Sequence, residues 1–213
     1  MPTATSSMLK WDVLVTNRQG LTRDLPPGKE KWMWVPTSAT LIYGERDAVL
    51  VDAFLTIDQA RAAVEWVAAS GKNLTTIYVT HGHGDHFFGI GALLDRFPNA
   101  KAVATANVLK VMRRQMSPEF VASFWKARYP SQIPEHLVLP EELQGNVIDL
   151  EGRELVAVEV GIPTPTTRRV FTCHRSGWSS LATPPTTMFT STSPSQTRKL
   201  AASGSLRSTP LRR

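Results

Sequence analysis

The chain has 213 residues, 42% of them hydrophobic, which is enough for one substantial domain with its own core. Its longest apolar runs fall far short of the roughly 20 residues that a membrane span requires, and no charged start followed by an apolar stretch opens the sequence. Cys173 is the single cysteine, which excludes an internal disulfide and fits a reducing compartment. We therefore expect a cytoplasmic protein without membrane contact.

The charge and the composition both change at residue 161. Residues 1–161 carry 16 basic and 18 acidic residues, whereas residues 162–213 carry eight basic residues and no acidic one. Half of these last 52 residues are Ser, Thr or Pro, and they show no apolar periodicity. The composition predicts a globular domain over 1–161 and a disordered, basic, low-complexity tail over 162–213.

Strands and helices alternate along the first part, as is typical of an α/β fold. The β-rich runs 39–44 and 47–54 flank a turn-like stretch and predict a hairpin. A helix is expected over 56–72, because Thr56 or Asp58 can cap it and Gly71 can stop it. The other expected elements are a strand at 74–80, a helix at 89–98, a strand at 101–106, helices at 106–116 and 117–130, and two strands within 146–161.

The sequence THGHGDHFFG, residues 80–89, places three histidines and one aspartate within six positions, directly after a predicted strand. Neutral imidazole and carboxylate groups suit Zn²⁺ or another first-row metal. His81 and His83 can reach one metal, while Asp85 and His86 can reach a second. The glycines between them are expected to leave backbone room for a sharp loop.

This cluster resembles the signature of the metallo-β-lactamase superfamily, a group of metallo-hydrolases with an αββα sandwich fold. The resemblance covers roughly residues 35–161, so it implies an α/β chain in which the N-terminal half of that sandwich is present. It implies four metal ligands, His81, His83, Asp85 and His86. It also implies a supporting role for Asp52, which ends an early strand and helps to hold the metal loop.

The resemblance further implies a reaction. One or two zinc ions, or other first-row metals, generate hydroxide from water, and this hydroxide attacks an ester, lactone, thioester or β-lactam carbonyl of a small-molecule substrate. Asp85 is then also a catalytic residue, because it orients the nucleophile and handles protons. A histidine at position 86 resembles lactonases, glyoxalase II-like thioesterases and one subclass of β-lactamases.

The remaining ligands of such a site are missing from this sequence. The family places a histidine after a glycine at the end of a later strand, then a Gly-Asp pair after an apolar strand, then a last histidine. Here Ile162 follows Gly161, and beyond it the chain has no aspartate and one histidine, His174, which we interpret as incidental. We therefore expect a truncated active site, impaired activity and weak, substoichiometric zinc binding.

A shift of the reading frame by one base offers an explanation. The codons of the tail, read one frame over, permit GHPDTDD directly at position 161 and the apolar strand LGLVVAGD further on, followed by an amphipathic helix. A histidine, a buried strand and a Gly-Asp pair then appear in the order of the family. Our hypothesis is that one base was lost near codon 161 and that residues 162–213 are an out-of-frame translation.

Two alternatives remain open. The chain is an active hydrolase if another chain completes its site. It is instead a non-catalytic nucleic-acid-binding protein if the basic tail is its functional part. The tail has no interleaved aromatic residues and no recognisable binding module, so we do not expect nucleic acid as a partner.

The predicted helix at 117–130 carries aromatic residues at helical spacing. Phe120, Phe124 and Trp125 are expected to pack in the core. In enzymes that resemble this chain, helices at this position roof the active site, which is the alternative interpretation of these three residues.

Overall fold

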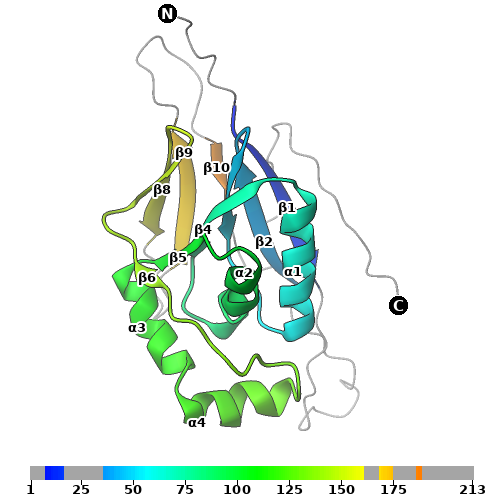
Figure 1. Cartoon of the computed structure of the whole chain (residues 1–213). Coiled ribbons are helices and arrows are strands. Elements are labelled where there is room, and N and C mark those ends of the chain that lie inside the picture. The colour runs from blue at the N-terminus through cyan, green and yellow to red at the C-terminus, as the bar shows by residue number, and fades with distance from the viewer. Residues whose placement is uncertain (1–7, 17–35, 161–167, 175–185, 189–213) are drawn as a thin grey trace, which may run out of the picture.

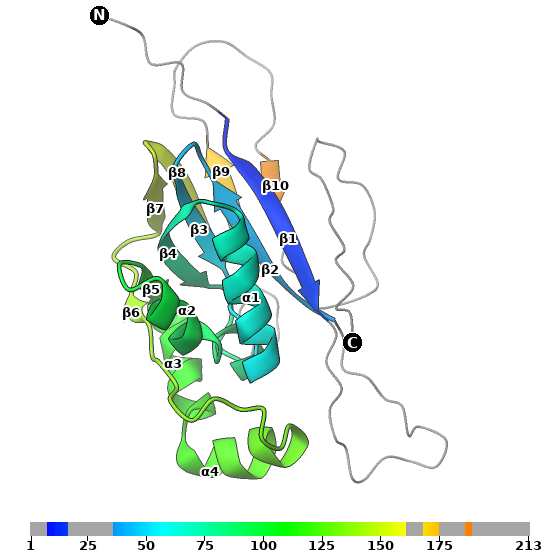
Figure 2. The same cartoon turned by 45° about the vertical axis from the view of Figure 1, so that its right-hand side comes forward.

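Two β-sheets lie face to face, and helices cover the outer face of the first sheet (Figure 1). The computed structural model describes residues 8–16, 36–160, 168–174 and 186–188. Figure 2 shows the helices on one side of the first sheet and strands β7, β8 and β9 on the other. The described residues thus form three of the four layers of the predicted αββα sandwich.

The first sheet has six strands in sequence order. They are β1 (Lys10–Thr16), β2 (Thr37–Tyr43), β3 (Asp47–Val51), β4 (Asn73–Val79), β5 (Lys101–Ala104) and β6 (Glu141–Glu142). Strands β1 to β3 are antiparallel, which confirms the predicted hairpin of β2 and β3, and β3 to β6 are parallel. Because parallel strands end at the same edge, the segments after β3, β4 and β5 meet there.

The helices begin and end close to the predicted signals. They are α1 (Ile57–Ala69), α2 (Ile90–Arg96), α3 (Ala106–Gln115) and α4 (Pro118–Phe120), which runs on into a π-helical segment, η2 (Val121–Lys126). Thr56 and Gln59 form a capping box at the start of α1, and Gly71 follows its end with φ of 67°. The π-helical turn was not predicted. No helix in the described part of the chain is long and apolar enough to cross a membrane.

Both faces of the central strands are buried, which explains their nearly continuous apolar sequence. On one face, Leu50 of β3 and Ile77 of β4 pack against the helices. On the other, Val49 of β3 and Tyr78 of β4 face the second sheet. The alternation of side chains along each strand therefore divides the core into two clusters, one on each side of the first sheet.

The second sheet has the order β10-β9-β8-β7. Its strands are β7 (Val147–Leu150), β8 (Arg153–Val160), β9 (Arg168–His174) and β10 (Thr186–Met188). The first two confirm the predicted pair of strands at 146–161. The prediction of a tail without regular structure is wrong for β9 and β10. Strand β9 pairs antiparallel with β8 from Arg168 opposite Val160 to His174 opposite Glu154, and β10 pairs antiparallel with β9.

Strand β9 forms because the edge of β8 is available for pairing and the tail contains a short β-rich run. Strand β8 offers unpaired backbone groups on the side away from β7, and the run Val170–Cys173 has the β-branched and aromatic character that favours a strand. His174, which we interpreted as an incidental histidine, is the last residue of that strand. The rest of the predicted disordered tail, residues 162–167, 175–185 and 189–213, lies outside the described residues.

A carboxylate joins the hairpin turns of the two sheets. Glu151 lies in the turn between β7 and β8 with φ of 55°, and Gly152 follows with φ of 75°. The Glu151 carboxylate accepts backbone N–H groups of Glu45, Arg46 and Asp47 at 2.9, 2.7 and 2.7 Å. A side chain at Gly44 would collide with this carboxylate, so the glycine permits the approach. We name this contact the Glu151 latch.

The latch is expected to contribute to stability in a pH-dependent manner. The three backbone donors lower the pKa of Glu151 to about 2, so the folded protein favours the carboxylate. This stabilisation is fully present above the unfolded pKa of about 4.5 and is lost as the pH falls toward 2. Because Glu151 is only partly buried and solvent screens its charge, we expect Glu151→Gln to cost only about 1 kcal/mol at pH 7.

Thermal melts of the two proteins at pH 7 and at pH 2.5 measure this effect. The difference between them should shrink at the lower pH. Glu135→Gln, at an exposed position, is the control and should melt like the parent at both values. Equal melting of Glu151→Gln and the parent at pH 7 would show that the latch contributes nothing.

Candidate metal centre

The histidine cluster begins where β4 ends. Thr80 and His81 follow the last residue of that strand, and a short 3-10 turn, η1 (Gly84–His86), closes the loop. The backbone N–H of Ala53, just after β3, donates to the carbonyl of His86 at 2.7 Å. Two adjacent parallel strands therefore position the loop from both sides.

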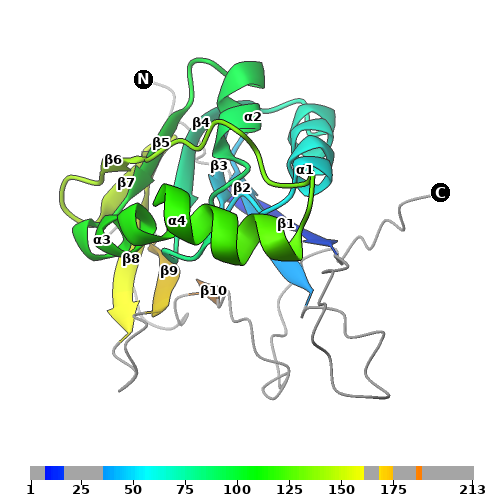
Figure 3. The same ribbon diagram turned by 90° about the horizontal axis from the view of Figure 1, so that it is seen from below.

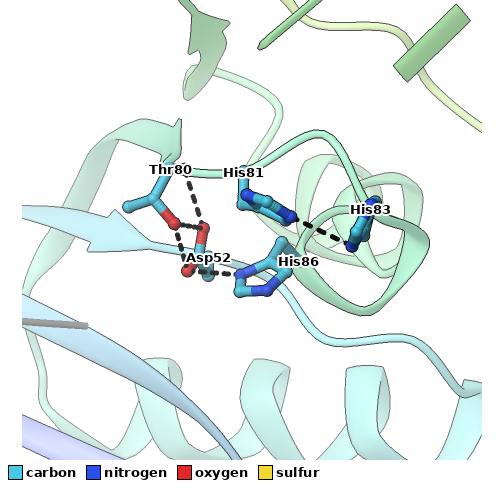
Figure 4. A network of polar contacts seen from close by, with 5 residues as sticks. All are labelled: Asp52, Thr80, His81, His83 and His86. Atoms are coloured by element: carbon cyan, nitrogen blue, oxygen red, sulfur yellow. Dashed lines mark hydrogen bonds and ion pairs between the residues drawn. The ribbon is translucent and has the colours of Figure 1, made fainter. Parts of the chain in front are cut away.

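His81 and His83 point at each other. Nε2 of His81 lies 3.0 Å from Nδ1 of His83, and the two rings meet edge to face (Figure 4). Two nitrogens bound to one tetrahedral zinc at about 2.0–2.1 Å would be about 3.3 Å apart. The pair therefore fits two corners of a zinc site with only a small movement.

His86 is held by a buried carboxylate. Its Nδ1 lies 2.8 Å from Oδ2 of Asp52, which is 1% exposed (Figure 4). The same carboxylate accepts the backbone N–H of Thr80 at 2.9 Å and its hydroxyl at 2.8 Å. A carboxylate on one ring nitrogen fixes the tautomer of an imidazole so that the other nitrogen, here Nε2, is the one that coordinates. The predicted supporting position of Asp52 thus coincides with a direct contact to His86.

The network also fixes the loop that contains Asp52. This residue has φ of 65°, a left-handed conformation that aspartate tolerates better than most side chains. Its backbone N–H donates to the carbonyl of Tyr78 at 2.9 Å. Thr80 was not singled out from the sequence, although its place between a strand and the first histidine was visible there.

Electrostatics favour the neutral form of the first two histidines. Burial lowers the pKa of His81 to about 4, with a further contribution from the positive charges of His86 and His83. Burial likewise lowers the pKa of His83, against the opposing charge of Asp85. Near pH 7 both rings are neutral, which is the protonation state that binds a metal.

The two glycines of the motif are required by close packing. A side chain at Gly82 would collide with Val111 of α3, and one at Gly84 would collide with the rings of Phe88 and Trp125. Neither glycine is among the residues with positive φ. The glycines leave room as expected, and that room is occupied by side chains of the helices that pack on the loop.

The predicted site residues come together in part. His81, His83 and His86 form a cluster, with 5.0 Å between the ring centroids of His81 and His86. Asp85 lies in the same turn and acts on both His81 and His83 through its charge. No group of three or more His, Cys, Asp or Glu side chains in the described part of the chain has the arrangement of a metal site.

Replacing Asp52 by Asn should weaken zinc binding about 10- to 100-fold, the usual cost of losing a partner of a metal ligand. Asn also tolerates the left-handed backbone, so the substitution removes the charge and leaves the loop intact. Competition with a chromophoric chelator measures the affinity. Asp95→Asn, an exposed aspartate on α2, is the control. Unchanged zinc affinity in Asp52→Asn would mean that the carboxylate does not support the site.

Comparison with known proteins places the chain in a family. The profile of the Metallo-beta-lactamase superfamily matches residues 32–167, more than half of the sequence. The chain is 28% identical over 136 residues to YobT of Bacillus subtilis (strain 168), covering 61% of this chain and 52% of YobT. It is 27% identical over 95 residues to hydroxyacylglutathione hydrolase of Actinobacillus pleuropneumoniae serotype 5b (strain L20), covering 45% and 36%. The chain thus spans about half or less of the length of these relatives.

Solved structures with a similar arrangement include two metallo-beta-lactamases. SMB-1 bound to 2-mercaptoethanesulfonate gives a TM-score of 0.48 at 24% identity, covering 64% of this chain and 51% of SMB-1. MEM-A1, isolated from a soil metagenome library, gives 0.49 at 19% identity, covering 79% and 60%. The profile match spans strands β2 to β8, the helices and the histidine cluster, and it establishes that the chain belongs to the metallo-beta-lactamase superfamily.

Proposed function

We propose that this chain derives from a zinc-dependent hydrolase acting on an ester, thioester, lactone or β-lactam carbonyl, and that its own activity is impaired. The observation that carries the proposal is the arrangement of the histidines. Nε2 of His81 and Nδ1 of His83 face each other at 3.0 Å, and the buried carboxylate of Asp52 orients His86 beside them. This is the arrangement expected of a metal-binding loop whose ligands are fixed before the metal arrives.

In this proposal, His81 and His83 hold one zinc ion, and Asp85 and His86 contribute to a second. Zinc supplies an acidified water and charge stabilisation for a carbonyl oxygen when it is bound. The residues of this chain keep the imidazoles of His81 and His83 neutral through burial and orient that of His86 through Asp52 and Thr80. The Asp85 carboxylate, in the same turn, is the proposed proton acceptor.

The impairment follows from the number of ligands. A catalytic zinc site uses three protein ligands, and His81 with His83 provides two for the first metal. The matched family and the name of one relative support a hydrolase, since the family is the Metallo-beta-lactamase superfamily and the relative is hydroxyacylglutathione hydrolase. The proposed substrate class is therefore a compound with an activated carbonyl group.

Zinc stoichiometry tests this proposal. The protein is purified, stripped with a chelator, loaded with zinc and dialysed against zinc-free buffer, and its metal content is measured by elemental analysis. We expect clearly less than one zinc per chain. Two tightly held ions per chain would contradict the proposed impairment and favour a site completed by a partner chain.

A further inference from the structure

A stripe of aromatic and cationic side chains runs along the helix formed by α4 and η2. Phe120 and Phe124 stack with centroids 5.0 Å apart and planes 19° apart. The guanidinium of Arg128 lies 3.8 Å from the centroid of Phe124, and its Nη1 donates to the carbonyl of Phe124 at 3.1 Å. All three side chains are half-buried, so the stripe has an inner side on the core and an outer side in solvent.

The stripe adjoins the histidine loop through one buried ring. Trp125 is 3% exposed, packs against Gly84 between His83 and Asp85, and donates its indole N–H to Gln115 at 3.0 Å. The ring of Phe124 meets that of Trp125 edge to face at 4.9 Å. Trp125 thus packs in the core as predicted, and Phe124 lies one ring away from the loop that carries the metal ligands.

The view from below shows where this helix lies. In Figure 3, α4 and the helical residues after it pass in front of the strands of the first sheet, next to α3. The helix therefore lies across the end of the sheet where the segments after the parallel strands emerge. A π-helical turn such as η2 is a local irregularity found frequently at functional sites.

The helices in this position are basic, unlike the rest of the domain. Residues 106–129 contain five basic residues and one acidic residue. The remainder of residues 1–161 contains 11 basic and 17 acidic residues. A cationic surface beside the loop on an otherwise acidic domain raises the local concentration of anions. Arg128 adds a planar fork of donors, of which one is used by Phe124, and this fork matches the geometry of a carboxylate.

We propose that the stripe of Phe120, Phe124 and Arg128 is a specificity element for substrates that join an apolar acyl or aryl group to a carboxylate. The apolar group packs on the outer edges of the two phenylalanine rings, and the carboxylate binds the Arg128 guanidinium. Hydrolysis of a substrate bound in this way rests on the proposed function. The binding itself requires neither zinc nor turnover.

A pair of non-reacting probes tests the proposal. The full chain is titrated in the presence of a chelator with 4-phenylbutyrate and with 4-phenylbutyramide, and saturation-transfer NMR measures both affinities. The two probes differ in charge and share the aromatic group. We expect the anion to bind about 10-fold more tightly, because only the carboxylate forms a charge-assisted hydrogen bond with the Arg128 guanidinium.

Three variants locate the site. Arg128→Gln should lose about 10-fold in affinity for the anion and keep its affinity for the amide. Phe124→Leu should weaken both probes. Lys126→Gln removes one charge from the same helix at an exposed position outside the stripe, and it should change neither affinity.

Equal affinities for the two probes, or absence of saturable binding, would overturn the proposal. So would an equal loss of anion binding in Arg128→Gln and Lys126→Gln, because that result indicates only diffuse charge. These outcomes differ from a failure of the proposed function, since a chain that binds the anion through Arg128 but hydrolyses nothing still satisfies this test.

Discussion

Insertion of one nucleotide after codon 161 is expected to raise the zinc content from a substoichiometric level to about two ions per chain and to create metal-dependent hydrolysis. Strand β8 belongs to the second sheet, and its residues Leu155 and Ala157 are buried in the core between the two sheets. The histidine cluster that precedes it has two nitrogens directed at one point and a supported His86. The proposed function requires further ligands, and the shifted frame permits a histidine beside Gly161 and a Gly-Asp pair after an apolar strand.

The measurement compares the two proteins side by side. Zinc is determined by elemental analysis after dialysis, and turnover is measured with an aryl ester, a lactone, a thioester and a chromogenic β-lactam, each with and without a chelator. Insertion of three nucleotides at the same place is the matched control, since it adds a residue and leaves the frame unchanged. If the chain in its present frame turns over as fast as the repaired one, the ligands described as missing are not needed.

Much of the first sheet and its helices could be predicted because the signals are local. Thr56 and Gly71 mark the ends of α1 through capping and a positive φ, which depend on neighbouring residues alone. The turn between β7 and β8 was visible as Glu151-Gly152 for the same reason. The candidate metal ligands were equally accessible, because four of them lie within six positions after a strand.

Other features depend on contacts between distant residues, and no local pattern announces them. The Glu151 latch joins residues more than 100 positions apart. The contact between Asp52 and His86 spans 34 positions, and only the resemblance to a family suggested that Asp52 was important. Strand β9 was missed because the β-rich run Val170–Cys173 is short and lies within Ser-, Thr- and Pro-rich surroundings, while the backbone groups of β8 that it pairs with belong to another segment.

The role of the two glycines in the motif also depends on residues that are distant in the sequence. From sequence, Gly82 and Gly84 suggested a loop that needs space for its backbone. The structure fills that space with Val111 beside Gly82 and Trp125 beside Gly84, side chains of helices that lie 29 and 41 residues further along the chain. Conformation and close packing both favour glycine, and they can be distinguished only when the neighbours are known.

Replacement of His83 by Ala in the frame-repaired chain is expected to reduce metal-dependent turnover by more than 100-fold. Loss of a group that merely supports a ligand costs about 10- to 100-fold, so loss of a ligand itself should cost more. His83 has a second contribution that Ala also removes, because its ring fixes that of His81 at 3.0 Å. The same replacement should lower the zinc affinity of the chain in its present frame, in which His81 and His83 form the paired nitrogens.

His136→Ala is the matched control, because this histidine is exposed on the segment before β6 and lies outside the cluster. It removes one imidazole from the chain without touching the loop, so adventitious zinc binding by surface histidines would fall equally in both variants. A thermal melt of each metal-free variant shows whether the fold is retained. Loss of one histidine from a pair that binds the same metal must lower the affinity for that metal. Equal zinc affinity and equal turnover in the two variants would therefore mean that the histidines after β4 are not ligands.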